Sequence, residues 1–161
     1  MAKRGIRSGE RVFLVVVDES DEMRVALLYA SLRAKAVGGK VALLYVIEPS
    51  DFLQWMAVEN LAREERRAEA ETLLNDLSVS VNKWAGSMPI LHVREGSRRE
   101  ELLKLIDEDP NISILVLAAS TNPVGPGPLI SALTTRFVND LKVPITIVPG
   151  DLSDEEIEAI A

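Results

Sequence analysis

Short, nearly continuous runs of aliphatic residues constrain the fold of this chain more than any other feature. They cover residues 11–17, 41–47 and 112–117, and each run ends in a turn of acidic or small residues. The runs lack the regular alternation of apolar and polar residues that marks a strand with one solvated face. Each therefore predicts a parallel strand that is buried on both faces.

Two further strands, at residues 89–94 and 142–149, have the features of sheet edges. The first is short and alternates in polarity. The second contains Pro144 and Pro149, which lack the amide hydrogen that a central strand must donate. These two strands are expected at or near the borders of the sheet.

Helical spacing of apolar residues predicts helices between the strands. The first covers residues 23–37, with an N-cap from the Asp18–Asp21 turn and an end at Gly38. The second covers residues 51–85, where Asn60 is a candidate position for a break. The third begins at Ser97, which forms an S-x-x-E capping box with Glu100, and the fourth begins at Pro128.

The alternating order of five strands and four helices predicts an α/β fold with a single doubly wound, five-stranded parallel sheet. The expected strand order is 3-2-1-4-5, which places the topological switch point between the first and fourth strands. Ligands bind beyond the carboxyl ends of the strands at such a point. We therefore expect Asp18 and the turn at residues 118–128 to face each other across one crevice.

Length and composition indicate one domain. The chain has 161 residues, of which 47% are hydrophobic, and it contains no cysteine. No segment approaches the ~18 uninterrupted apolar residues of a membrane span, and residues 1–10 lack the apolar stretch of a secretory signal. A cytoplasmic location without membrane contact is expected, with residues 1–10 as a flexible N-terminal segment.

The negative charge is concentrated at one end of the chain. The net charge is −7, and residues 151–161 hold five carboxylates and no basic residue. The rest of the chain is thus close to neutral. Neither part attracts a phosphate backbone, so nucleic-acid binding is disfavoured.

Most enzyme motifs are missing. The sequence contains no G-x-x-x-x-G-K-[ST] phosphate loop, no G-x-G-x-x-G after the first strand and no G-x-S-x-G elbow. His92 is the sole histidine, which rules out a two-histidine metal site within one chain. A hydrolase or transferase would lack its nucleophile and base.

Acidic residues cluster after the first two strands. A divalent-metal site is conceivable there, because carboxylates are ligands that magnesium accepts. Asp21 and Asp51 are better explained as helix caps. Asp18 differs, because at the strand tip beside the switch point its carboxylate could accept hydrogen bonds from a base or a ribose.

Five segments, taken in order, resemble the universal stress protein family. They are residues 15–18, 43–48, 94–96, 115–120 and 143–149. The resemblance implies an adenine nucleotide alpha hydrolase-like fold over residues 11–150. The residues themselves indicate that an acidic tail follows at 151–161, in which Ser153 is expected to cap a short helix from Glu155 to Ile160. The resemblance also implies a homodimer formed through the last strand, from Val143 to Val148.

The same resemblance implies positions for a nucleotide. Asp18 and Val46 match the residues that hold the adenine, the first by its side chain and the second by its backbone. Binding members carry G-x-x-G, about nine residues and then G-[ST]. Here Ala119 and Asn122 stand in place of the first two glycines, and Ser131 lies near the third.

Two other glycines, Gly125 and Gly127, follow in a Gly-Pro-Gly-Pro run that could rebuild an anion cradle. Against this, residues 105–135 contain no lysine or arginine to neutralise a triphosphate. The resemblance therefore implies a non-catalytic, homodimeric stress-response or regulatory protein with a degenerate or divergent adenine-nucleotide crevice. In that reading the acidic tail serves either as a contact for a partner protein or as a solubility device. The alternative is a true ATP- or AMP-binding member that uses magnesium and the rebuilt loop, with weak ATPase activity left open.

Overall fold

Five parallel strands form one sheet in the order β3-β2-β1-β4-β5. This computed structural model describes residues 9–49 and 56–161. The strands are β1 (Val12–Val16), β2 (Lys40–Ile47), β3 (Ile90–Glu95), β4 (Ile112–Ala119) and β5 (Ile145–Pro149). The predicted fold class and strand order are confirmed, with β1 paired to β4 at the switch point.

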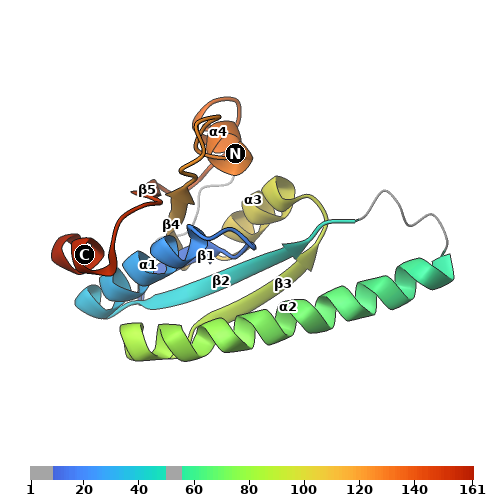
Figure 1. The fold of residues 1–161 in the computed structure, drawn as a ribbon, viewed down its shortest axis with the longest axis horizontal. Coiled ribbons are helices and arrows are strands. Elements are labelled where there is room, and N and C mark those ends of the chain that lie inside the picture. The colour runs from blue at the N-terminus through green and yellow to red at the C-terminus, as the bar shows by residue number, and fades with distance from the viewer. Residues whose placement is uncertain (1–8, 50–55) are drawn as a thin grey trace.

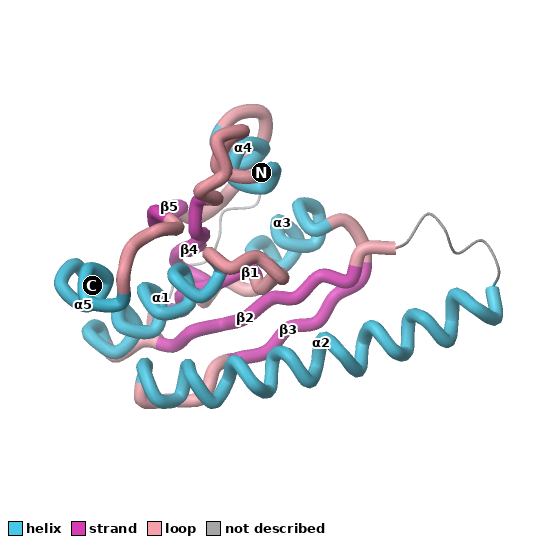
Figure 2. The backbone as a smooth tube through the Cα atoms, in the orientation of Figure 1, coloured by secondary structure: helices cyan, strands magenta, loops and turns pink. Residues whose placement is uncertain are grey.

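Helices cover both faces of the sheet (Figure 1 and Figure 2). They are α1 (Met23–Val37), α2 (Met56–Ala85), α3 (Arg98–Glu108), α4 (Pro128–Thr134) and α5 (Asp154–Ile160). Apolar residues of α1, α2 and α5 pack in one core cluster, and those of α3 and α4 pack in the other. No helix in the described part of the chain is both long and apolar enough to cross a membrane.

The burial of β1 on both of its faces explains why apolar and polar residues do not alternate in this strand. All five of its residues are buried. Phe13 and Val15 belong to the core cluster on the α1 face, whereas Val12, Leu14 and Val16 belong to the cluster on the α3 face. Each such side chain contributes roughly 1.5–3 kcal/mol when fully buried, so the two-sided core requires apolar residues at every position.

Several predicted helix ends are confirmed. Gly38 ends α1 in the left-handed conformation, with φ 68°. The Ser97 side chain caps α3 by accepting a hydrogen bond from the Glu100 amide at 3.5 Å. Gly127 is the N-cap of α4, and Pro128 follows it at the first helical position.

Two local predictions are wrong. The N-cap of α1 is Glu22, and its side chain makes no capping hydrogen bond, so neither Asp18 nor Asp21 caps this helix. The turn instead uses Asp18 to hold Ser20. The predicted break at Asn60 is also absent, because α2 runs without interruption from Met56 to Ala85. The proposed cap Asp51 lies outside the described residues.

The helix α2 is longer than the strands that it covers. In Figure 1 it runs along β2 and β3 and continues past their carboxyl ends. Its second half joins the core cluster on this face of the sheet through Leu74 and Val81, each at most 1% exposed. The predicted charged segment around residues 63–71 is mostly solvent-exposed and stands beside the carboxyl edge of the sheet.

The acidic tail contains the predicted short helix, α5, which packs on α1. The Ser153 side chain accepts a hydrogen bond from the Glu156 amide, and the Glu156 side chain accepts one from the Ser153 amide, which completes a capping box. Ile157 is fully buried in the core cluster of α1. Arg24 of α1 donates to both carboxylate oxygens of Asp154, at 2.7 and 3.0 Å.

Because Ile157 is fully buried and Ile160 on the same helix is 60% exposed, the two residues form a matched pair. Ile157→Ala should lower the free energy of unfolding by about 2–4 kcal/mol, through lost burial and the cavity left behind. Ile160→Ala should change it by less than about 0.5 kcal/mol. Chemical denaturation of both variants measures this. Equal, small effects would mean that the tail helix does not pack on α1 in solution.

Candidate functional site

Two adjoining cavities lie over the carboxyl ends of the central strands. The larger, of about 590 Å³, is bounded by the ends of β1 and β2 and by α2 and α3. The smaller, of about 230 Å³, lies between the end of β1, the start of α1 and the loop after β4. Asp18, Ser20 and Arg98 line both cavities, so we treat them together as the crevice. Its place matches the predicted switch-point site.

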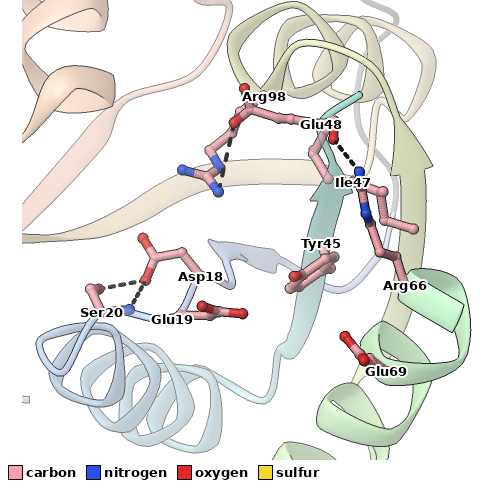
Figure 3. A pocket seen from close by; sticks show the side chains of 10 residues that line it. Asp18, Glu19, Ser20, Tyr45, Ile47, Glu48, Arg66, Glu69 and Arg98 are labelled. Carbon is pink, nitrogen blue, oxygen red and sulfur yellow. Dashed lines mark hydrogen bonds and ion pairs between the residues drawn. The ribbon is translucent and has the colours of Figure 1, made fainter. Parts of the chain in front are cut away.

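Asp18 occupies the centre of the crevice because it follows β1 directly. One of its carboxylate oxygens accepts a hydrogen bond from the Ser20 amide at 2.8 Å and another from the Ser20 hydroxyl. Figure 3 shows this pair beside the open cavity. Such an Asx turn holds the carboxylate in place at the strand tip. The smaller cavity is lined by both Asp18 and Gly127, as the sequence predicts.

The larger cavity is polar and carries charges of both signs. Its walls include Tyr45 and Val46 from β2, Arg66 and Glu69 from α2, and Glu19 from the turn after β1. Val46 lines this cavity although the residue as a whole is only 3% exposed. Burial, aided by the charge of Glu19, raises the pKa of the Tyr45 hydroxyl. Tyr45 therefore stays protonated and can act as a hydrogen-bond donor at neutral pH.

The loop at residues 120–127 is closed by its own hydrogen bonds. The Ser120 amide donates to the Pro126 carbonyl at 2.9 Å, and the Asn122 amide donates to the Ser120 hydroxyl at 3.1 Å. The Val124 amide donates to the Asn122 side chain at 3.0 Å, and the Gly125 amide donates to the Asn122 carbonyl at 3.1 Å. Four amides that could have faced an anion are thus used within the loop.

The seven predicted site residues fall into two groups. Those that line the crevice are Asp18, Val46 and Gly127. Those that line neither cavity are Ala119, Asn122, Gly125 and Ser131. In the second group, Asn122 and Gly125 build the closed loop, and Ser131 is exposed on α4.

Ala119 lies close to Gly150, the residue that follows β5. A side-chain carbon on Gly150 would lie 2.1 Å from the Ala119 carbonyl oxygen and 2.9 Å from the Cβ of Glu22. The end of β4 is therefore packed against the chain that leaves β5 and against the start of α1. Gly150 therefore permits a close approach that any residue with a side chain would block.

Arg98, the first residue of α3, lines both cavities although sequence reasoning did not select it. Its guanidinium reaches from α3 toward Asp18 (Figure 3), and its Nη2 lies 3.8 Å from the Glu48 carboxylate. The absence of lysine and arginine from residues 105–135 does not bear on cations that reach the crevice from other elements. The third strand of a parallel sheet also ends at the carboxyl edge, so the Gly96-Ser97-Arg98 turn was the signal that could have identified this residue.

The titratable groups that line the crevice among the described residues are carboxylates, a phenol and guanidinium groups. In the part of the chain that the structure describes, no cluster of three or more histidine, cysteine, aspartate or glutamate residues could hold a metal ion. His92 lies on β3 and lines neither cavity, and burial lowers its pKa. The arrangement offers several carboxylates, a phenol and two guanidinium groups. It is suited to binding a polar ligand through hydrogen bonds, with the guanidinium groups as the contacts available to an anionic group.

Comparison with known proteins agrees with this geometry. The model of the family described as "Universal stress protein family" matches residues 10–149. The resemblance seen in the sequence over residues 11–150 is thereby confirmed. No curated protein sequence matches the chain.

Solved structures share the fold at low sequence identity. Universal stress protein UspA from Lactobacillus plantarum superposes with a TM-score of 0.74 at 18% identity, covering 88% of this chain and 99% of that one. The universal stress protein from Archaeoglobus fulgidus in complex with dAMP gives 0.60 at 15%, covering 87% and 98%. A universal stress protein in complex with cAMP gives 0.56 at 18%, covering 89% and 100%. With the family match spanning nearly the whole sheet and its crevice, the chain belongs to the universal stress protein family.

Proposed function

We propose that this chain is a non-catalytic regulatory protein that binds an adenine nucleotide in the crevice. The observation that carries the proposal is the pair of cavities joined at Asp18, at the switch point of the sheet. The larger cavity falls in the range of about 300–1,000 Å³ typical of small-molecule sites. A base would occupy the larger cavity near Val46, and the sugar would lie over Asp18.

Two kinds of observation support this proposal. Universal stress proteins of the same fold have been solved with dAMP and with cAMP bound. In this chain Asp18 and Val46, which the sequence resemblance associates with adenine, both line the larger cavity. The Asp18 carboxylate is an acceptor that suits a ribose hydroxyl or an exocyclic amine.

A regulatory role without catalysis is supported by the hydroxyl groups of the crevice. The Ser20 hydroxyl donates to Asp18, and the Ser120 hydroxyl accepts from the Asn122 amide. Neither serine is paired with a histidine, since the one histidine of the chain lies on β3. Neither hydroxyl therefore has the serine–histidine pairing that activates many serine nucleophiles.

A second candidate is a ligand-free interaction module. It is favoured by the loop at residues 120–127, whose four amides are engaged internally and offer no cradle to a phosphate. In this candidate the exposed carboxylates of α5, such as Glu155 and Glu158, would contact a partner protein. A nucleotide titration separates the two candidates.

Nucleotide binding should depend on Asp18 and not on its neighbour Asp21, which lines neither cavity. Asp18→Asn keeps an oxygen for Ser20 and removes the charge, so the Kd for AMP should rise about tenfold or more. Asp21→Asn should leave it unchanged within about twofold. Isothermal titration with AMP, and with ATP plus magnesium, measures both.

The wild-type protein should give saturable binding at submillimolar AMP. Absence of binding by wild type at millimolar AMP and ATP would reject the proposal in favour of the interaction module. Equal weakening by the Asp18 and Asp21 variants would place the ligand outside the crevice.

We also propose a homodimer formed through the segment from Val143 to Val148. The strand β5 lies at the border of the sheet and pairs on one side with β4. Ile147 in this strand is 42% exposed. An edge strand that displays an aliphatic side chain is a template for pairing with another chain.

Ile147→Glu should convert the dimer to a monomer, because it places a charge in the centre of the proposed interface. Val79→Glu is the matched control, since Val79 is 71% exposed on α2, away from β5. Light scattering at micromolar concentration measures the mass of each. A monomeric wild type, or a dimer that survives Ile147→Glu, would contradict this interface.

A further inference from the structure

We propose that Arg98 binds the phosphate of the nucleotide and selects ligands with a single phosphate group. This inference rests on the proposed adenine-nucleotide function of the crevice and adds a specificity-determining residue to it. In this chain the guanidinium of Arg98 would donate the hydrogen bonds to phosphate that the backbone amides of a glycine-rich loop would otherwise donate.

The position of Arg98 suits that role. Among the described residues that line the smaller cavity, it is the one cation, and Ser120 and Gly127 stand on the wall formed by the loop. In Figure 3 the guanidinium extends toward the Asp18 carboxylate, over which the sugar would lie. A phosphate attached to that sugar would fall between Arg98 and the loop.

The charge of Arg98 is weakly compensated within the chain. Its Nη2 lies 3.8 Å from a Glu48 carboxylate whose side chain is 54% exposed, which is a long and solvated ion pair. Its Nε atom is buried and has no hydrogen-bond partner among the described residues. Arg94, on the preceding strand, donates instead to Glu108 at 2.6 Å. Arg98 therefore retains capacity for an anion.

The location of Arg98 on α3 has an electrostatic cost that its contacts do not offset. A cation in the first turn of a helix is opposed by the helix dipole. The adjacent Arg99 gains from the Phe137 ring, whose centroid lies 3.9 Å from its guanidinium carbon. Arg98 packs on no ring among the described residues. An anion bound in the crevice would supply the missing stabilisation.

The loop after β4 offers little competition for the phosphate. Four of its amides donate within the loop, and residues 105–135 carry no lysine or arginine. The carboxylates of Asp18 and Glu22 line the same cavity as Arg98. The lining of this cavity carries one guanidinium against two carboxylates, so a phosphate can be held there only by direct contact with Arg98. The further phosphates of ATP would find no second cation in this lining and would add repulsion from the carboxylates. The ligand class is therefore an adenosine monophosphate, open or cyclic.

The test compares AMP, adenosine, and ATP with magnesium by isothermal titration. Wild type should bind AMP about tenfold or more tightly than adenosine, because the phosphate adds charge-assisted hydrogen bonds. ATP should bind no more tightly than AMP. Arg98→Gln should abolish the preference for AMP over adenosine and leave adenosine binding within about twofold. Arg98→Lys should retain part of the preference, and the control Arg99→Gln, which lies outside both cavities, should retain all of it.

Any different outcome contradicts a specific part of the proposal. If Arg98→Gln keeps the preference for AMP, or weakens adenosine as much as AMP, Arg98 does not bind the phosphate, and the proposed function still stands. If ATP binds more than about tenfold tighter than AMP, the single-phosphate selectivity is wrong. If wild type binds neither adenosine nor AMP at millimolar concentration, the proposed function itself fails and Arg98 has no such ligand.

Discussion

The parallel pairing of β1 with β4 is the constraint on which the rest of the structure depends. Val15 and Val116 are register partners, and both are fully buried. From this pair α1 departs toward one face of the sheet and α4 belongs to the other. A space opens between the two departing chains, and Asp18 stands in it because it follows β1 directly. Gly150 lets the chain after β5 approach Ala119 and the start of α1 closely.

The crevice is assembled from elements that are distant in the sequence. Asp18 comes from the end of β1, Val46 from β2, and Arg98 from the start of α3. Arg66 comes from α2, which extends past the carboxyl ends of the strands that it covers. The charges of the crevice are mixed, with carboxylates around two guanidinium groups. Such a site suits a neutral base and sugar with limited negative charge, and it disfavours a polyphosphate.

Local signals in the sequence were accurate where one residue type has one strong physical role. Gly38 adopts the left-handed conformation at the end of α1, Ser97 caps α3, and Pro128 opens α4. They failed where several residues compete for one role. The turn at Asp18–Asp21 contains several good capping residues, yet the N-cap of α1 is Glu22 and makes no side-chain capping bond, while Asp18 and Ser20 hydrogen-bond each other. Asn60 is tolerated inside α2, since helix propensity differences of a few tenths of a kcal/mol do not break a long helix.

The sequence by itself determined the sheet, its strand order and the edge of the sheet where a ligand would bind. It could do so because runs buried on both faces and right-handed crossovers admit few topologies. The tertiary structure alone decided which groups face the crevice. The loop with Gly125 and Gly127 uses its amides in hydrogen bonds of its own and does not present them to a ligand. Arg98 lines the crevice from a helix that lies 80 residues after Asp18 in the sequence. Both outcomes depend on hydrogen bonds within a loop and on how far a side chain extends from one packed element toward another. Neither produces a periodic pattern of residues that can be recognised in the sequence.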